Sequence, residues 1–522
     1  MGCTREPRVG LVSTFRFPVP VDKPAVERYW LVIDSFVLYH LTKGFDHIFL
    51  YSDDPEGGSD GVYVERIQET FSMSQVSVRV RNEEQRDRQS RNCRLWDKLG
   101  AFYETDVHAR QTLNAEEALN AAAKIGLNWL LHIDIDELFY SSEASIKPHF
   151  SMLEDLGVEQ MTYANHEGVP CREDVSNFFT EVGLFRINHL VLSLSGAVGE
   201  CMEFWRRRRK HGQYLLAYDN GKSAVSVQPG TVLPESVHRW RRAPRRVGKG
   251  ATNQITPQAL PMDGDDDAHS ALCKDGSGLD EGTDNEDTPL VSRTALADPR
   301  DLNVCGLLEC QDPCVLHYIN CGLDWLWDKY SLLGAFPSSW YGGRLPIAPC
   351  FHLDARDVVA GGGSEQTDRG LSDRSGGERW GWPTDKGCSK GPCISEGNRQ
   401  MRRDRAADLY HKQVMLCPIQ DKGELRKQLK CGVLREIKGP ASVIKAAQRA
   451  RDKHHAPSEQ MVEEEENRIM GSGVGRSGDS GGKRSVSPFI AGGAARKNDP
   501  TVHSGAGCQK EWILASVARD YL

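Results

Sequence analysis

The amino-acid sequence predicts an α/β fold that is built on a parallel sheet. Apolar segments of strand length alternate with segments whose apolar residues recur at helix spacing, and aspartates follow two of the strands. In such folds helices connect neighbouring strands, and ligands bind beyond the carboxyl ends of the strands. We therefore expect the functional side chains at the positions where the predicted strands end.

The first predicted elements are three strands and one long helix. Residues 8–14 form a short apolar strand, and Pro24 opens a helical segment that ends at Gly44. Residues 46–51 form the second strand. Alternating valines over residues 76–80 predict the third strand.

A second helix and a fourth strand follow a charged stretch over residues 82–92. Asn114 is expected to cap a helix over residues 115–125, because Glu117 completes a capping box. Residues 128–134 then form the fourth strand. Strands and helices that alternate in this way indicate a parallel sheet.

The fourth strand ends in three carboxylates, Asp134, Asp136 and Glu137. If the chain stays extended, the first two point to the same face, because side chains alternate along a strand. Two carboxylates at a sheet edge form part of a site for Mg²⁺ or Mn²⁺, which phosphate oxygens of a substrate usually complete. We therefore predict Asp134 and Asp136 as metal ligands. The alternative is a strand that runs into an Asp-rich turn.

A distant histidine often completes such a site, and the sequence offers two candidates. His238 follows a Pro-Gly turn, so a short connection can return it to the sheet edge. His317 lies in an apolar run, residues 315–319, which packing explains more easily. Both remain candidates, and the sequence favours His238.

Two more aspartates, Asp53 and Asp54, end the second strand. In a doubly wound sheet they lie on the same edge as the end of the fourth strand. A nucleoside held there would extend its diphosphate toward Asp134 and Asp136. A simple turn is the plain alternative for Asp53-Asp54-Pro55.

Lys222 is a candidate for binding phosphate. The preceding Asn220-Gly221 predicts a hairpin turn between residues 214–218 and 224–227. A phosphate loop is excluded, because Leu216 stands where that loop needs a glycine. From the turn, the ammonium group of Lys222 is expected to reach a phosphate.

An apolar strand followed by Asp-x-Asp also opens the haloacid-dehalogenase phosphohydrolases, in which the first aspartate is a nucleophile. In that family the motif ends the first strand and is followed by Thr or Val. Here it lies behind earlier strands, and Glu137 occupies the following position. The hydrolase interpretation is therefore the weaker one.

Composition divides the 522-residue chain into one core with long inserts rather than several domains. Segments that are rich in acid, glycine and serine bury too little apolar surface to offset the entropy of ordering, so they are predicted to be disordered. The predicted parts are a core over residues 8–240, an acidic insert over 241–312, more core over 313–358, a Gly/Ser-rich insert over 359–400, a helical segment over 401–450 and a disordered tail over 451–522.

Charge, cysteines and hydropathy exclude several classes. The basic runs at residues 206–210 and 239–249 have no stacking aromatics or known module beside them, so no nucleic-acid partner is expected. Cys305, Cys310, Cys314 and Cys321 superficially resemble a metal cluster, but they lack the paired Cys-x-x-Cys that structural zinc sites usually show. No apolar run approaches the about 18 residues of a membrane span, and no signal sequence precedes the first strand.

Residues 27–51, Arg110-Gln111 and residues 129–137 together resemble glycosyltransferase family 92 and the related family-2-like transferases of plants and algae. Supporting pieces follow in the same order at residues 220–225, 237–240, 316–318, 327–330 and 410–412. The resemblance implies a GT-A fold, a UDP-sugar donor, Mn²⁺ (or Mg²⁺) and inversion at the anomeric carbon. It also implies a Golgi location with a membrane anchor, whereas this chain shows none, so a soluble enzyme or a truncated gene model is expected.

The resemblance also suggests roles for individual residues. Asp136 would bind the metal, and Asp134 the ribose or the metal through water. An inverting reaction needs a carboxylate that takes the acceptor proton. The candidates are Glu167, Glu173 and Asp174. The other expected nucleotide-sugar contacts are Asp53, Asp54, Arg110, Gln111 and Lys222.

The predicted function is a metal-dependent transfer of a hexose, with galactose favoured, from a UDP-sugar to a glycan acceptor. A catalytically silent relative that binds a nucleotide or a glycan is the first alternative. A phosphohydrolase that uses the Asp-x-Asp motif is the second.

Overall fold

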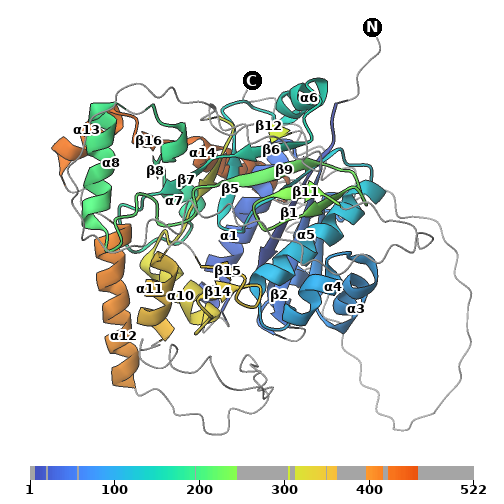
Figure 1. Cartoon of the computed structure of the whole chain (residues 1–522), viewed down its shortest axis with the longest axis horizontal. Coiled ribbons are helices and arrows are strands. Elements are labelled where there is room, and N and C mark those ends of the chain that lie inside the picture. Colours follow the sequence, from blue (N-terminus) through green and yellow to red (C-terminus); the bar gives the residue numbers. More distant parts are fainter. Residues whose placement is uncertain are drawn as a thin grey trace, which may run out of the picture. The chain divides into compact units, whose positions relative to one another are not determined.

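The computed structural model describes residues 6–18, 22–55, 58–193, 195–243, 304–305, 312–347, 350–360, 396–415 and 421–455. The chain divides into two compact units, Met1–Ile444 and Lys445–Leu522. The sheets and the candidate site belong to the first unit (Figure 1). Within the described ranges, none of the helices combines the length and the apolar composition that crossing a membrane requires.

The larger sheet contains the four predicted strands as parallel neighbours. Its seven strands have the order β12-β6-β9-β4-β1-β2-β3. Their bounds are β1 (Val9–Phe15), β2 (His47–Pro55), β3 (Val76–Arg81), β4 (Trp129–His132), β6 (Gln160–Tyr163), β9 (Lys222–Ser226) and β12 (Val304–Cys305). The order of β3, β2, β1 and β4 is that of a Rossmann-like nucleotide-binding half. The predicted α/β class with a parallel sheet at its core is confirmed.

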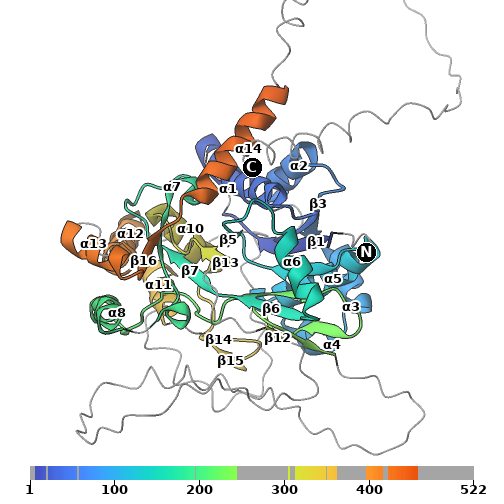
Figure 2. The ribbon, with the colours of Figure 1, turned by 90° about the horizontal axis from the view of Figure 1, so that it is seen from above.

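A second sheet of five strands lies beside the first (Figure 2). Its order is β16-β8-β7-β13-β5, with the bounds β5 (Glu137–Tyr140), β7 (Asn165–Gly168), β8 (Leu184–Arg186), β13 (Cys314–His317) and β16 (Leu434–Glu436). The chain leaves the first sheet at β4 and enters the second at β5. The Asp-x-Asp segment is the connection between the two sheets.

The predicted first helix is confirmed as α1 (Lys23–Thr42), and Gly44 after it has a φ of +97°. Helix α5 (Val107–Lys124) packs on the larger sheet, where its alanines lie against Val12, Phe49 and Leu130. The other helices are α2 (Gly61–Thr70), α3 (Glu83–Asn92), α4 (Trp96–Leu99), α6 (Lys147–Asp155), α7 (Phe178–Glu181), α8 (Gly196–Arg208), α10 (Leu323–Leu333), α11 (Phe351–Ala360), α12 (Glu396–Leu409), α13 (Lys422–Lys430) and α14 (Gly439–His455). Short strands β10 (Val232–Pro234) and β11 (Trp240–Arg242) pair with each other, as do β14 (Ser339–Trp340) and β15 (Leu345–Pro346).

The predicted start of the second helix at Asn114 is wrong. Helix α5 begins two turns earlier, and Asp106 is its N-cap, because its carboxylate accepts from the backbone N–H of Ala109 at 3.1 Å. Asn114 is buried within the helix and accepts hydrogen bonds from Gln85 and Gln89 of α3. A polar side chain that resembled a cap thus binds a neighbouring helix, and the charged stretch 82–92 contains that helix.

The predicted hairpin at Asn220-Gly221 is also wrong. Strand β9 pairs antiparallel with β4 and β6, and residues 214–218 form no strand. The turn itself is present, since Gly221 has a φ of +73°. In the large sheet, β9 pairs with a strand on each side, whereas a local hairpin would give it one partner.

Replacing Gly221 with alanine is expected to lower the free energy of unfolding by at least about 2 kcal/mol, because a left-handed φ strains any other residue and the added Cβ would clash with the carbonyl oxygen of Tyr163. Gly230 is a matched control, since its φ is +81° but its Cβ would meet open space. Denaturant unfolding of both variants measures the difference. Equal destabilisation of the two would contradict the close approach to β6.

The predicted inserts lie largely outside the described residues, which exclude 244–303, 306–311, 361–395 and 456–522. At the edges of these inserts the structure departs from the predicted limits. Strand β12 lies within the predicted insert 241–312 and pairs with β6 of the larger sheet. Helix α14 continues through His455, beyond the predicted start of the tail at residue 451.

Candidate active site

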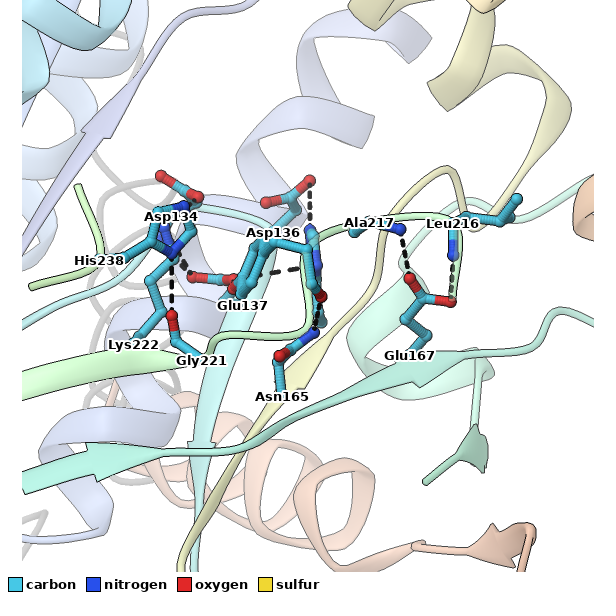
Figure 3. Close-up of polar contacts among 12 residues, drawn as sticks. Asp134, Asp136, Glu137, Asn165, Glu167, Leu216, Ala217, Gly221, Lys222 and His238 are labelled. Carbon is cyan, nitrogen blue, oxygen red and sulfur yellow. Dashed lines mark hydrogen bonds and ion pairs between the residues drawn. The ribbon is translucent and has the colours of Figure 1, made fainter. Parts of the chain in front are cut away.

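The Asp-x-Asp segment turns instead of staying extended. Strand β4 ends at His132, a turn includes Asp136, and β5 begins at Glu137. The Glu137 side chain closes this turn by accepting from the backbone N–H of Asp134 at 2.7 Å. The expected alternation along one strand is therefore wrong, but both aspartate carboxylates still point to the same side of the chain (Figure 3).

Each aspartate pairs with one lysine. The ammonium Nζ of Lys222 lies 2.7 Å from Oδ2 of Asp134, and that of Lys329 lies 3.0 Å from Oδ2 of Asp136. Burial alone would raise the pKa of both carboxyls, but the neighbouring ammonium groups hold the pKa of each well below its usual range. The pKa of each lysine is raised in turn, because its aspartate outweighs burial. We call these four side chains, which are all charged at neutral pH, the Asp–Lys cluster.

Strand pairing explains the position of Lys222. Ala224 of β9 pairs with Leu131 of β4, so Lys222 lies level with the end of β4. Its side chain is 0 % exposed and also lies 3.8 Å from Glu137. Lys222 comes from a central strand rather than from a hairpin tip, and its contact with a phosphate remains a prediction. Gln111 of α5 donates to the other oxygen of Asp134 at 3.1 Å, so this predicted residue also belongs to the site.

Glu137 is buried and holds the site together. It accepts a hydrogen bond from the hydroxyl of Tyr218, and His317 lies 3.9 Å from its Oε1. Burial raises the pKa of Glu137 to about 7, with Lys222 opposing the shift. Because Glu137 also accepts from the backbone N–H of Asp134, it supports the shape of the turn.

The two histidines occupy different places. Nε2 of His317 lies 3.8 Å from Oδ2 of Asp136, whereas Nδ1 of His238 hydrogen-bonds the carbonyl oxygen of Gly221 at 2.8 Å. The preference for His238 is thus not supported by these positions. The physical reason is a long-range pairing: β13 is antiparallel to β5, and His317 pairs with Glu137.

The pKa values of the two histidines are shifted in opposite directions. Burial would lower the pKa of His317, but the neighbouring carboxylate of Asp136 outweighs it, so this pKa is raised. The pKa of His238 lies well below its usual value because of burial and the charge of Lys222. His238 is therefore neutral at neutral pH.

Tyr218 is a site residue that the sequence analysis missed. Its ring stacks on His317 at 5.2 Å, meets His238 edge-on at 4.4 Å, and lies 5.1 Å from Nζ of Lys222. Its hydroxyl donates to Glu137. One side chain thus orders both histidines, and no local pattern around it signals this role.

Asp53 and Asp54 end β2 as predicted, but both bind groups of the protein. Asp53 pairs with Arg110, whose Nη2 lies 2.7 Å from Oδ2, and both side chains are buried. Asp54 lies 3.3 Å from Arg16 and accepts from the backbone N–H of Asp60. A ligand that uses either carboxylate would have to exchange with these partners.

Glu167 is buried in β7 and is fully engaged. Nη2 of Arg186 lies 2.6 Å from its Oε2, and the backbone N–H groups of Leu216 and Ala217 donate to it (Figure 3). Burial would raise its pKa, but Arg186 and these donors lower it. Glu167 thereby fixes the backbone that leads into Tyr218.

The other two candidate bases are exposed. The Asp174 side chain is 83 % exposed and lies 3.8 Å from Arg172. Glu173 lies 2.9 Å from Nε2 of His411, and both of these side chains are about half exposed. The assignment of the base therefore remains a prediction.

Two side chains of the site can together bind one divalent cation. Among the described residues, no group of three or more His, Cys, Asp and Glu side chains is arranged for a metal ion. Asp136 and His317 offer an oxygen and a nitrogen that are 3.8 Å apart. Two ligands at roughly 2.1 Å from one ion can span that distance, and phosphate oxygens or water supply the remaining positions in Mg²⁺-type sites. Asp136 and His317 thus fit such an ion when a diphosphate accompanies it.

Two Arabidopsis thaliana proteins that are named glycosyltransferase-like are similar to this chain. One is 30% identical over 213 residues, which cover 39% of this chain and 45% of that protein. The other is 28% identical over 226 residues, which cover 41% of each. The chain therefore spans less than half the length of these relatives. No model of a known protein family matches the chain.

Two solved structures show a distant likeness to this chain. A core-mannan synthase from Aspergillus fumigatus, in a form with Mn and GDP, has a TM-score of 0.21 and 12% identity, and the match covers 44% of this chain and 61% of that one. A mouse xyloside xylosyltransferase has a TM-score of 0.17 and 11% identity, with 30% and 52% covered. Structural similarity this weak does not indicate a function. By sequence, the chain is similar to plant glycosyltransferase-like proteins over about two fifths of its length.

Proposed function

We propose that this protein is a metal-dependent glycosyltransferase that uses a nucleotide-sugar donor. The observation that carries the proposal is the Asp–Lys cluster with His317 at the carboxyl end of β4, beside a Rossmann-like half-sheet. Carboxylates for a cation and ammonium groups for a diphosphate occur together there, as a donor of this class requires. The similarity to glycosyltransferase-like plant proteins supports the same conclusion.

The residues of the site would share the work of donor binding. Asp136 and His317 would hold Mn²⁺ or Mg²⁺, which when bound neutralises charge on the departing diphosphate. Lys222 and Lys329 would add positive charge close to the same phosphates. Asp134, oriented by Gln111 and Lys222, would bind the ribose or a metal-bound water.

The finer assignments follow from the family resemblance. We propose a UDP-sugar as donor, a hexose with galactose favoured, a glycan acceptor, inversion at the anomeric carbon, and a Golgi location. The acceptor's proton must be taken by a base that the acceptor can reach. Exposure supports Asp174 or Glu173 for this role, whereas Glu167 is enclosed by its partners.

A thermal-shift panel of UDP, GDP and sugar phosphates, each with and without Mn²⁺, tests the proposal on the full chain. UDP with Mn²⁺ is expected to raise the Tm by roughly 5 °C at a 100-fold excess over its Kd, because a ligand that binds only the folded state stabilises it. Without Mn²⁺ the shift should largely disappear. Release of UDP from UDP-galactose in the presence of acceptor glycans then measures turnover.

The other outcomes separate the alternatives. Stabilisation by UDP with no turnover on any donor would indicate a silent nucleotide-binding relative. Hydrolysis of sugar phosphates without a nucleotide response would indicate a phosphohydrolase. No response to any nucleotide would end the proposal.

A further inference from the structure

The metal ligand Asp136 already has a cationic partner in the free protein. Nζ of Lys329 lies 3.0 Å from Oδ2, and this is the same oxygen that faces Nε2 of His317 at 3.8 Å. An ion that bridges Asp136 and His317 would use that oxygen. Lys329 and the ion therefore compete for one atom.

The two lysines of the Asp–Lys cluster differ in their freedom to move. The Lys222 side chain is 0 % exposed, lies over the Tyr218 ring and is close to a second carboxylate, Glu137. The Lys329 side chain is 31 % exposed, and Asp136 is its only carboxylate partner among the described residues. A long flexible side chain with an exposed part can leave its partner at low cost, whereas a fully enclosed one cannot. Lys329 is thus the lysine that can exchange.

The backbone that carries Lys329 is held in place. Its neighbour in α10, Asp328, accepts a hydrogen bond from the Tyr29 hydroxyl of α1 at 2.7 Å. Its other neighbour, Tyr330, is fully buried in a core that α10 shares with α11 and α12. Exchange at Asp136 therefore requires movement of the Lys329 side chain and leaves the helix where it is.

The charges of the site determine when a metal ion can replace Lys329 at Asp136. Two aspartates and two lysines make the Asp–Lys cluster neutral in the free protein. A divalent ion that enters alone would add two positive charges to a largely buried site, which is unfavourable without a partner anion. A diphosphate brings the compensating negative charge and offers oxygens to an ammonium group.

We propose that Lys329 occupies the metal position of Asp136 in the free protein and moves to the donor's diphosphate when metal and nucleotide bind together. This inference rests on the proposed function, because it takes Asp136 as a metal ligand. Lys329 would thus keep the site from binding free metal, and by contacting the diphosphate it would couple the ion to the nucleotide. The metal and the diphosphate then bind with strong mutual dependence.

The test measures binding rather than turnover. Mn²⁺ binding to the full chain without nucleotide is followed by the electron paramagnetic resonance of free Mn²⁺, and UDP binding at saturating Mn²⁺ is followed by calorimetry. Lys329→Met removes the competing charge, so its affinity for Mn²⁺ alone should rise at least about tenfold while its affinity for UDP falls at least about tenfold. Lys329→Arg keeps the charge and should leave Mn²⁺ binding as weak as in the parent.

Lys427 supplies a matched control. Its Nζ also lies 3.0 Å from a carboxylate, that of Glu200, but on the exposed surface. Lys427→Met should change neither titration. Circular dichroism establishes that each variant is folded before it is compared.

The outcomes distinguish failure of the proposed function from failure of the Lys329 exchange. If the parent shows no Mn²⁺-dependent UDP binding, the proposed function fails. If the parent binds UDP with Mn²⁺ but Lys329→Met does not bind Mn²⁺ more tightly, the exchange is overturned while the metal site stands. A gain in Mn²⁺ affinity with no loss for UDP would show that Lys329 blocks the metal position without moving to the diphosphate, which also overturns the proposal.

Discussion

Replacing Asp136 with asparagine is expected to weaken Mn²⁺-dependent UDP binding at least about 100-fold, because the variant loses the anionic ligand that the ion needs. The Tm of the free protein should change little, since the Lys329 ammonium that Asp136 leaves behind is 31 % exposed and can turn to solvent. Calorimetric titration of UDP in the presence of Mn²⁺ measures the affinity.

Asp134→Asn is the control for this substitution. The Asp134 carboxylate binds Lys222 and Gln111, whereas His317 lies against the carboxylate of Asp136. Its loss should weaken donor binding less than the loss of Asp136 and should leave Mn²⁺ binding in place. Equal UDP affinity in Asp136→Asn and in the parent would remove Asp136 from the metal site.

The second large effect concerns stability. Glu167→Gln is expected to lower the free energy of unfolding by about 3–5 kcal/mol, because it breaks one partner of a buried ion pair and leaves the Arg186 charge uncompensated. It also weakens the acceptor for the backbone N–H groups of Leu216 and Ala217. Urea unfolding, followed by circular dichroism, gives the difference.

Asp174→Asn provides the comparison, since its side chain is 83 % exposed and should change stability by less than about 0.5 kcal/mol. A large loss of stability in Glu167→Gln, with none in Asp174→Asn, would support the structural role of Glu167. If Glu167→Gln unfolds like the parent but lacks transferase activity, Glu167 acts in the reaction and the structural role is wrong.

Elements with local signals could be predicted from the sequence. The strands β1, β2, β3 and β4 and the helix α1 agree with apolar runs, alternating valines and helix spacing that lie within each element. The start of α5 could not be predicted, because Asn114 looks like a cap and is instead bound to α3, far from it in the sequence. The place of β9 depends on β4 and β6, which no local pattern around Gly221 shows.

Some residues of the candidate site could likewise be predicted from the local sequence, and others could not. Asp134 and Asp136 could be predicted from the consecutive residues 129–137 around β4, although the chain turns there. Lys329 is 193 residues from Asp136 in the sequence, and only the folded chain brings them together. The choice between His238 and His317 needed the pairing of β13 with β5, which joins segments on both sides of the predicted acidic insert.

The position of bound Mn²⁺ shows directly whether Asp136 and His317 hold the metal ion. A crystal structure of the full chain with Mn²⁺ and UDP, with data collected at the manganese absorption edge, locates the ion by its anomalous signal. We expect one peak at roughly 2.1 Å from both a carboxylate oxygen of Asp136 and Nε2 of His317, with phosphate oxygens completing the site. A peak on His238, or UDP bound at the end of β4 with no manganese beside Asp136, would contradict it.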